Sequence, residues 1–324
     1  MSVLAKKHFH DEKAAYAFVE AHVWPDGRAC PHCGVLGESG ALKGSSTRLG
    51  VYKCYACRKP FTVKVGTIFE ASHIPMHKWL QAIFLLSSSK KGISSNQLSR
   101  ALEITLKSAW FMSHRIREAM RDGSLGPLGG EGQVVEADET YHGKVAERKE
   151  PKAPRRNAYT KGGRVGVGQK RAIVSLVERG GRVRSFHVDR ADKATVAQIV
   201  MDNVARESRL HTDESRLYLG ADAHVAEHES VKHSAKEYAR GDVNTNSVEG
   251  FFSIFKRGMK GIYQHCGEKH LHRYLYEYDF RYNNRIALGV ADEARAVKAL
   301  KGVVGKRLTY RTTGGVNARQ EAQG

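Results

Sequence analysis

Apolar residues recur at intervals of three and four between residues 244 and 258, a spacing that predicts a helix. The apolar stripe consists of Val248, Phe251, Phe252 and Phe255. Glu249 lies one position past this stripe, and Lys256 follows it about two turns later on the same face. Such a helix suits packing on a sheet with one carboxylate offered to a site, but a surface helix with solvated charges would show the same pattern.

The same reading divides the rest of the chain into helices and strands. Helical spacing covers residues 11–24, 76–122, 195–206 and 270–285, with a break at 92–95, and we expect the aromatic residues of the last helix to lie in a core. Strands are predicted over residues 134–140, 171–178, 182–188 and 209–213, and the middle two form a hairpin. This order predicts an α/β domain whose first and fourth strands each end in an acid.

The net charge narrows the choice of partner. The 324 residues include 53 Lys and Arg against 34 Asp and Glu, a formal charge of +19. Such an excess favours a polyanion, above all nucleic acid. No apolar run approaches the ~20 residues of a membrane span, and the N-terminus lacks the apolar core of a secretion signal. We therefore expect a DNA partner, no membrane and no secretion.

Four of the five cysteines form two close pairs in the pattern C-x2-C-x20-C-x2-C, namely Cys30 with Cys33 and Cys54 with Cys57. Each pair suits a knuckle whose two thiolates face one ion, and two knuckles close a tetrahedron around zinc. We expect one structural Zn²⁺ in a zinc ribbon, with Cys266 outside it. The alternative is a set of four unrelated buried cysteines.

Residues 76–122 follow a helix-turn-helix pattern, in which a short helix and a tight turn precede a longer second helix. We expect four apolar residues of that second helix to face inward: Ala109, Met112, Ile116 and Met120. The polar residues expected to face outward are Lys107, His114, Arg115, Arg117 and Arg121. Arg115 is our candidate for a DNA contact here, although a plain three-helix bundle would show the same stripes.

A second basic segment covers residues 141–170, between the first predicted strand and the hairpin. It is irregular and carries many Lys and Arg residues, among them Arg155, Arg156 and Lys161. We expect these three to bind DNA phosphates. A solvated insertion without a partner is the alternative.

Three acids are candidates for one site. Asp138 and Asp213 end the first and fourth strands and become neighbours if those strands pair, while Glu249 arrives from the helix at 244–258. Converging carboxylates repel one another unless they hold divalent cations, and Mg²⁺ or Mn²⁺ accepts such oxygen ligands. Lys256, with Arg257 beside it, would face the DNA backbone.

Two other acids are alternative candidates for the second acid of this site, the position given to Asp213. Asp222 follows a Gly-Ala pair in a less strand-like context. Asp189 ends a strand that we expect to run antiparallel to the first, at its far end.

At these residues the chain resembles a known family. Asp138, Asp213 and Glu249, with thirty-five residues between the last two, are similar to the D-D(35)-E signature of RNase H-like transposases and retroviral-type integrases. The segments A-D-E-T-Y-H-G, N-T-N-S-V-E-G-F-F-S-I-F-K-R-G and F-R-Y-N-N-R resemble bacterial insertion-sequence transposases of the ISXO-like, Merlin-related branch. In that branch an Asn ahead of the Glu is sometimes written as the third catalytic position, and Asn246 matches it. We prefer Glu249, because its charge binds a metal better.

The resemblance implies the organisation and the reaction. It implies a zinc ribbon with a leading helix over residues 1–70, a helix-turn-helix-like DNA-binding domain over 75–123, an RNase H-like catalytic core over 133–290 and a basic tail over 291–324. It implies cleavage at the inverted repeats that end the element and strand transfer into target DNA, by a homodimer on double-stranded DNA in the bacterial cytoplasm, at the nucleoid. Two alternatives remain open: a DNA-binding regulator with an inactive core, and a structure-selective nuclease.

Overall fold

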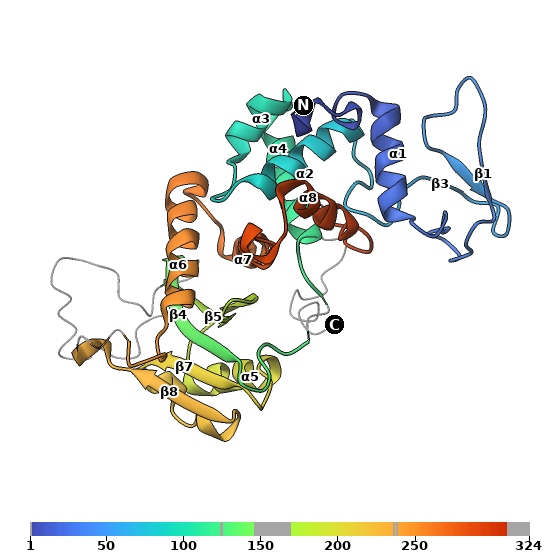
Figure 1. Cartoon of the computed structure of the whole chain (residues 1–324). Coiled ribbons are helices and arrows are strands. Elements are labelled where there is room, and N and C mark those ends of the chain that lie inside the picture. Colours follow the sequence, from blue (N-terminus) through green and yellow to red (C-terminus); the bar gives the residue numbers. More distant parts are fainter. Residues whose placement is uncertain (1, 124–125, 146–169, 236, 238, 310–324) are drawn as a thin grey trace. The chain divides into compact units, whose positions relative to one another are not determined.

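The computed structural model describes residues 2–123, 126–145, 170–235, 237 and 239–309. The chain divides into two compact units (Figure 1). The first consists of Met1–Phe84, Ser95–Ala119 and Ala296–Gly324, and the second of Leu85–Ser94 and Met120–Arg295. Most of the basic segment at 141–170, including Arg155, Arg156 and Lys161, lies outside the described residues.

The first unit begins with helix α1 (Glu12–Val23) and a small sheet. Asp11 caps α1 as expected, because its Oδ1 accepts a hydrogen bond from the N–H of Ala14 over 2.7 Å. The sheet is antiparallel, in the order β1 (Ser39–Ala41), β2 (Tyr52–Cys54) and β3 (Pro60–Phe61). It brings the two cysteine pairs to one end of the ribbon.

Three helices follow the ribbon: α2 (Met76–Ser88), α3 (Ser95–Leu102) and α4 (Leu106–Ala119). The apolar residues expected to face inward from α4 and just after it are buried. The prediction that its polar residues face outward is wrong for His114, Arg115 and Arg117, which are buried as well. Arg115 donates from Nη1 to the carbonyls of Ile68 and Glu70, 2.8 Å away in each case. Because the segment at 68–70 uses this guanidinium, Arg115 has no part in the DNA surface that we propose below.

The segment predicted as a basic tail, 291–324, begins with helix α8 (Asp292–Lys301). Ala299, Leu300 and Val303 are buried, and Val303 accepts a hydrogen bond at its carbonyl from the N–H of Ile68. Ala299 and Leu300 lie in the last turn of α8, and Val303 follows the helix.

The second unit is built on a five-stranded sheet in the order β6-β5-β4-β7-β8. The strands are β4 (Val134–Lys144), β5 (Lys170–Glu178), β6 (Val183–Val188), β7 (Arg209–Asp213) and β8 (Glu227–Val231). β4, β5 and β6 are antiparallel neighbours, whereas β7 and β8 continue the sheet parallel to β4. The predicted hairpin and fourth strand are confirmed, but β4 runs past its acids and β8 is absent from the prediction.

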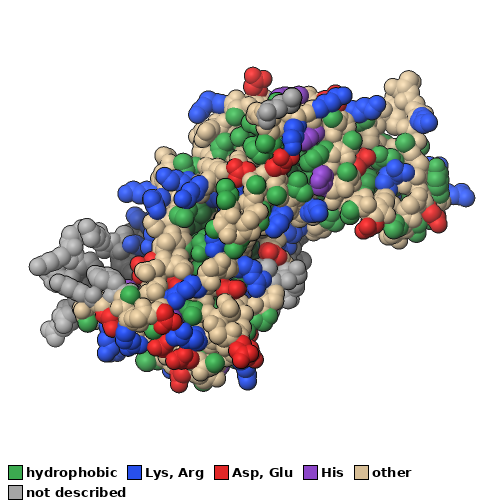
Figure 2. Space-filling model, in the orientation of Figure 1, with side chains coloured by type: hydrophobic (Ala, Val, Ile, Leu, Met, Phe, Trp, Pro, Cys, Tyr) green, Lys and Arg blue, Asp and Glu red, His purple; other side chains and the backbone are tan. Residues whose placement is uncertain are grey.

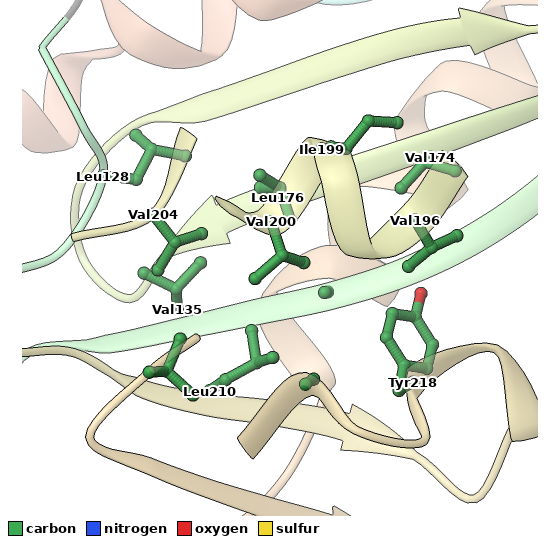
Figure 3. Close-up of a cluster of buried hydrophobic side chains, with 13 residues drawn as sticks. Leu128, Val135, Val174, Leu176, Val196, Ile199, Val200, Val204, Leu210 and Tyr218 are labelled. Atoms are coloured by element: carbon green, nitrogen blue, oxygen red, sulfur yellow. The ribbon is translucent and has the colours of Figure 1, made fainter. Parts of the chain in front are cut away.

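Helices cover both faces of this sheet (Figure 1). α5 (Lys193–Asn203) packs on one face through Val196, Ile199 and Val200, in a cluster that includes Tyr218 (Figure 3). α6 (Asn246–Gly258) and α7 (Leu271–Asn283) cover the other face. The four apolar stripe residues of α6 form a core there with Tyr274 and Tyr278 of α7, and Tyr282 packs against it. The mixed sheet with its flanking helices is the RNase H-like architecture that the sequence predicts.

Short turns complete the fold. They are 3₁₀ turns at Val3–Ala5, Lys7–Phe9, Arg216–Tyr218, Ala221–Ala223, His233–Ala235, Glu268–His270 and Ile286–Leu288, and a π turn at Met259–Tyr263. None of the helices in the described part of the chain has the length and apolar character that a membrane crossing needs.

Candidate active site and zinc centre

Asp138 and Asp213 lie on neighbouring parallel strands at the centre of the second unit. The ladder between β4 and β7 pairs Val134 with Arg209 and Glu136 with His211. The same offset sets Asp138 level with Asp213, and side chains at one level of parallel strands point to the same face. That face is the one covered by α6, because the alternating residues Val135 and Ala137 belong to the core under α5.

Glu249 reaches this edge of the sheet from the first turn of α6. Its side chain is 50% exposed, and its Oε1 accepts a hydrogen bond from the Thr245 hydroxyl over 2.9 Å. His233, in the turn after β8, brings its Nε2 to 3.4 Å from the same oxygen. The carboxylate is therefore oriented by its neighbours while one side stays open to solvent.

The acids influence one another. Burial raises the pKa of Asp138 to about 7, and the charges of Glu139, Asp213 and Glu249 raise it as well. The N–H of Glu139 donates to Oδ1 of Asp138 over 2.7 Å, which opposes the rise. Carboxylates that repel one another in this way, with one side open, are a donor set that a divalent cation relieves.

Glu139 is an acid of this site that the sequence analysis did not single out. Burial and the charge of Asp213 raise its pKa, and it accepts hydrogen bonds from the hydroxyls of Tyr218, over 3.1 Å, and Ser215, over 3.4 Å. Because side chains alternate along β4, Glu139 points toward the α5 side, away from Asp138. Its place directly after Asp138 in the sequence was the available signal.

The acids are less closely packed than the cysteines. Among the described residues, the group of three or more potential metal ligands whose ligand atoms all lie within 4.8 Å of one another is Cys30, Cys33, Cys54 and Cys57. The sulfurs of Cys30 and Cys57 are 3.7 Å apart, and those of Cys33 and Cys54 are 3.6 Å apart. Four thiolates around one zinc at about 2.3 Å lie about 3.8 Å from each other, so this cluster fits a structural Zn²⁺. Cys266 belongs to the second unit and is not a member of this group.

Asn246, Lys256 and Arg257 share helix α6 with Glu249 and are exposed. The Lys256 ammonium lies 5.7 Å from the centre of the Phe252 ring, and its charge, after burial and Arg171, lowers the pKa of His142 on β4. Arg257 bonds back to Ser253 of its own helix. Lys and Arg side chains gather over the end of α6 that leads on toward α7 (Figure 2).

The two alternative candidates for the second acid, Asp222 and Asp189, do not lie on β7. Asp222 belongs to the 3₁₀ turn Ala221–Ala223 and is exposed. Asp189 follows β6, which is antiparallel to β5 and therefore parallel to β4. The expectation that its strand runs antiparallel to the first is thus wrong, because β5 intervenes between the two, and Asp189 lies two strands away from Asp138.

Two stretches of the chain match known families. Residues 127–283 match the ISXO2-like transposase domain, and residues 10–60 match a transposase zinc-ribbon domain. Over 258 residues the chain is 30% identical to an uncharacterized protein in transposable element ISH50 of Halobacterium salinarum. The aligned region covers 78% of this chain and 84% of that protein.

Two solved structures are also similar to parts of the chain. One is the simian T-cell lymphotropic virus intasome in complex with PP2A regulatory subunit B56 gamma, with 12% identity and a TM-score of 0.28 over 56% of this chain and 63% of that chain. The other is the Mos1 strand transfer complex, with 14% identity and a TM-score of 0.23 over 63% of this chain and 75% of that chain.

Proposed function

The chain belongs to the insertion-sequence transposases with an ISXO2-like transposase domain, and from this membership we propose that Asp138, Asp213 and Glu249 hold the cations with which it cuts and joins DNA. The reaction would be cleavage at the terminal inverted repeats of its element, followed by strand transfer into a target. We thus propose a requirement for divalent cations, three acids that bind them, and the terminal inverted repeats as the DNA that is cut.

The observation that carries the proposal is that Asp138 and Asp213 each stand two residues past the paired Glu136 and His211 on parallel strands, where the charge of Asp213 helps to raise the pKa of Asp138 to about 7. A cation bound beside Asp138 would favour the charged form of this carboxyl. Mg²⁺ or Mn²⁺ bound there would activate a water or a 3′-hydroxyl and would stabilise the leaving oxygen of a phosphodiester.

The chain's own residues would supply position and charge. The sheet fixes Asp138 and Asp213 rigidly, and Glu249 would approach them from α6 with its carboxylate oriented by Thr245. Lys256 lies two turns further along the same helix, about 10 Å from Glu249 along its axis, and would bind a DNA phosphate as a point charge. Asn246, exposed in the same turn as Glu249, would contact the substrate beside it.

DNA binding would come from several parts of the chain. The zinc ribbon and α2–α4 would recognise the element ends, and the basic residues Arg155, Arg156, Lys161 and Arg257 would add sequence-independent affinity for phosphates. Two ends must be joined in one event, so the active species would be a homodimer on double-stranded DNA.

The test is a cleavage and joining assay on DNA that carries the inverted repeats of the element. We expect Asp138→Asn, Asp213→Asn and Glu249→Gln each to abolish cleavage in Mg²⁺ while end binding persists, because each change removes one ligand charge at almost constant shape. Asp189→Asn and Asp222→Asn are matched controls that remove a charge away from the site and should cut like the parent protein.

Other outcomes point to the two alternatives. A folded parent protein that binds the ends but never cuts them would be a regulator. Carboxylate variants that cut as the parent does would refute the assigned site. A parent that cuts branched DNA of any sequence, with no preference for the ends in a competition assay, would be a structure-selective nuclease.

A further inference from the structure

Glu136 is an acid of β4 that lies inside the second unit. It stands two residues before Asp138 and therefore points to the same face of the sheet, toward α6. Its side chain has no exposed surface. A carboxylate is buried so completely only where hydrogen bonds and an opposite charge replace water, so its partners show what it does.

Those partners are the first turn of α6. Oε2 of Glu136 accepts hydrogen bonds from the backbone N–H groups of Ser247, over 2.7 Å, and Val248, over 3.1 Å. The Ser247 hydroxyl donates to Oε1 over 2.9 Å. The N–H groups of a first helical turn lack partners within their own helix and carry partial positive charge, so an anion is favoured there.

One of the first N–H groups of α6, that of Asn246, donates to Oδ1 of Asn244 over 3.2 Å. Thr245 occupies the cap position without making a capping bond, because its hydroxyl is used on Glu249. For the next two N–H groups, those of Ser247 and Val248, Glu136 supplies from β4 the cap that a residue before the helix usually provides. A cap from another strand also fixes where the helix begins relative to that strand.

Arg179 completes the attachment from the turn between β5 and β6. It forms an ion pair with Glu136 at 2.9 Å and donates to the backbone carbonyls of Asp242, over 2.8 Å, and Asn244, over 3.1 Å. The loop that enters α6 is thus held by the same buried pair that caps the helix. Glu136 stands two positions before Asp138, and its partners Ser247 and Val248 stand two positions and one position before Glu249.

We propose that Glu136 is a positioning residue of the transposition reaction: by binding the first turn of α6 to β4, it sets the distance from Glu249 to Asp138 and Asp213. The inference rests on the proposed function of those three acids. Asp138 follows Glu136 by two residues and Glu249 follows Val248 by one, so the Glu136–Val248 hydrogen bond links the two sides of the site through a short stretch of chain on each side. A shift of α6 along β4 would separate the ligands without changing the zinc ribbon or α2–α4, which we propose to recognise the element ends.

The test is Glu136→Gln, which keeps the shape but replaces one acceptor oxygen with an NH₂ group. If the NH₂ group takes the place of Oε2, it faces the N–H groups of Ser247 and Val248. If it takes the place of Oε1, it faces the Arg179 guanidinium. A donor meets a donor in both cases. Glu178→Gln is the matched control, because Glu178 lies on the adjacent strand β5 and pairs with Arg182, with no role at α6. Ser247→Ala is a milder variant that removes only the hydroxyl bond.

We expect Glu136→Gln to bind the element ends like the parent protein but to require a higher Mg²⁺ concentration for half-maximal cleavage. Residues that hold metal ligands in place typically contribute about 10- to 100-fold to metal affinity or activity. Ser247→Ala should shift the requirement in the same direction by less, and Glu178→Gln should not shift it. Amide hydrogen exchange should rise in peptides that cover the first turn of α6 and stay unchanged in α7.

A folded Glu136→Gln protein with the parental Mg²⁺ requirement and cleavage rate would overturn the inference. If that variant does not fold, a folded Ser247→Ala protein with the parental requirement would overturn it. The two proposals fail separately: cleavage by Asp138→Asn would refute the catalytic assignment, whereas an inactive Asp138→Asn beside an unaffected Glu136→Gln would refute only the positioning role.

Discussion

Thr245 donates its hydroxyl hydrogen to Oε1 of Glu249, one turn further along α6, over 2.9 Å. Thr245 is buried, with 1% of its surface exposed, so this bond is sheltered from water. Asn246 lies between them in the same turn and is exposed, and within the described structure its side chain has no hydrogen-bond partner. The local structure thus orients Glu249 and not Asn246.

The first prediction separates these two candidates for the third catalytic position. We expect Glu249→Gln to abolish cleavage, because an amide cannot replace the charge of a metal ligand, and Asn246→Ala to retain it at a reduced rate. The measurement is strand cleavage at the element ends in Mg²⁺. Cleavage by Glu249→Gln together with an inactive Asn246→Ala would transfer the role to Asn246.

The second prediction concerns the zinc centre. Cys30 is buried and its sulfur lies 3.7 Å from that of Cys57, so Cys30→Ser should lose the metal and unfold the ribbon around Phe61. Metal analysis of the purified protein should find one zinc in the parent and none in the variant. Cys266→Ser is the control and should keep its zinc; a Cys30→Ser protein that does so too would contradict the assignment.

The third prediction concerns the basic segment at 141–170. Neutralising Arg155, Arg156 and Lys161 together should weaken binding to every DNA sequence and flatten the salt dependence, because each phosphate contact releases counterions. The slope of log K against log salt should fall in magnitude by roughly 2 to 3. An unchanged slope would show that the segment is solvated and has no partner.

The fourth prediction uses two glycines of α6 as a matched pair. A Cβ at Gly258 would lie 2.7 Å from the carbonyl oxygen of Lys91 and against the Tyr278 hydroxyl, whereas a Cβ at Gly250 would meet no atom within 4 Å. Gly258→Ala should lower the free energy of unfolding by about 1–3 kcal/mol. Gly250→Ala should raise it by about 0.5–1 kcal/mol, because alanine restricts the unfolded chain. Denaturant unfolding measures both; equal effects would mean that α6 does not pack closely on α7.

The fifth prediction concerns pH. Asp279 of α7 accepts hydrogen bonds from the N–H and the hydroxyl of Ser185 on β6, yet burial raises its pKa to about 7. The folded protein therefore binds this proton more tightly than the unfolded chain does, and stability falls as the pH rises from about 4 to 7. Asp279→Asn keeps the acceptor for the Ser185 N–H and should remove this loss.

Between pH 5 and pH 8 the free energy of unfolding should fall further in the parent than in Asp279→Asn, by on the order of 2 kcal/mol. Urea unfolding of both proteins at the two pH values measures it. A parent and a variant that lose the same stability over this interval would show that Asp279 is ionised throughout.

Local sequence determines much of this protein. The spacing of Cys30, Cys33, Cys54 and Cys57 predicts the ribbon because zinc coordination demands that spacing, and the stripe of α6 predicts a buried face because helical period and apolar spacing coincide. The run from Arg209 to Asp213 predicts β7 with the observed bounds. Two strands that each end in an acid predict neighbouring acids, and the parallel pairing of β4 with β7 agrees.

Tertiary structure decides what covers the polar faces. Apolar periodicity shows which side of α4 packs inward, but it cannot show that the segment at 68–70 also covers Arg115 on another side. Glu136 likewise reads as one more acid at the end of a strand, and only the folded chain shows that the first turn of α6 has been bound to it. Hydrogen bonds between residues more than a hundred positions apart leave no period in the sequence, so a buried charge and its partners become visible only when the chain has folded.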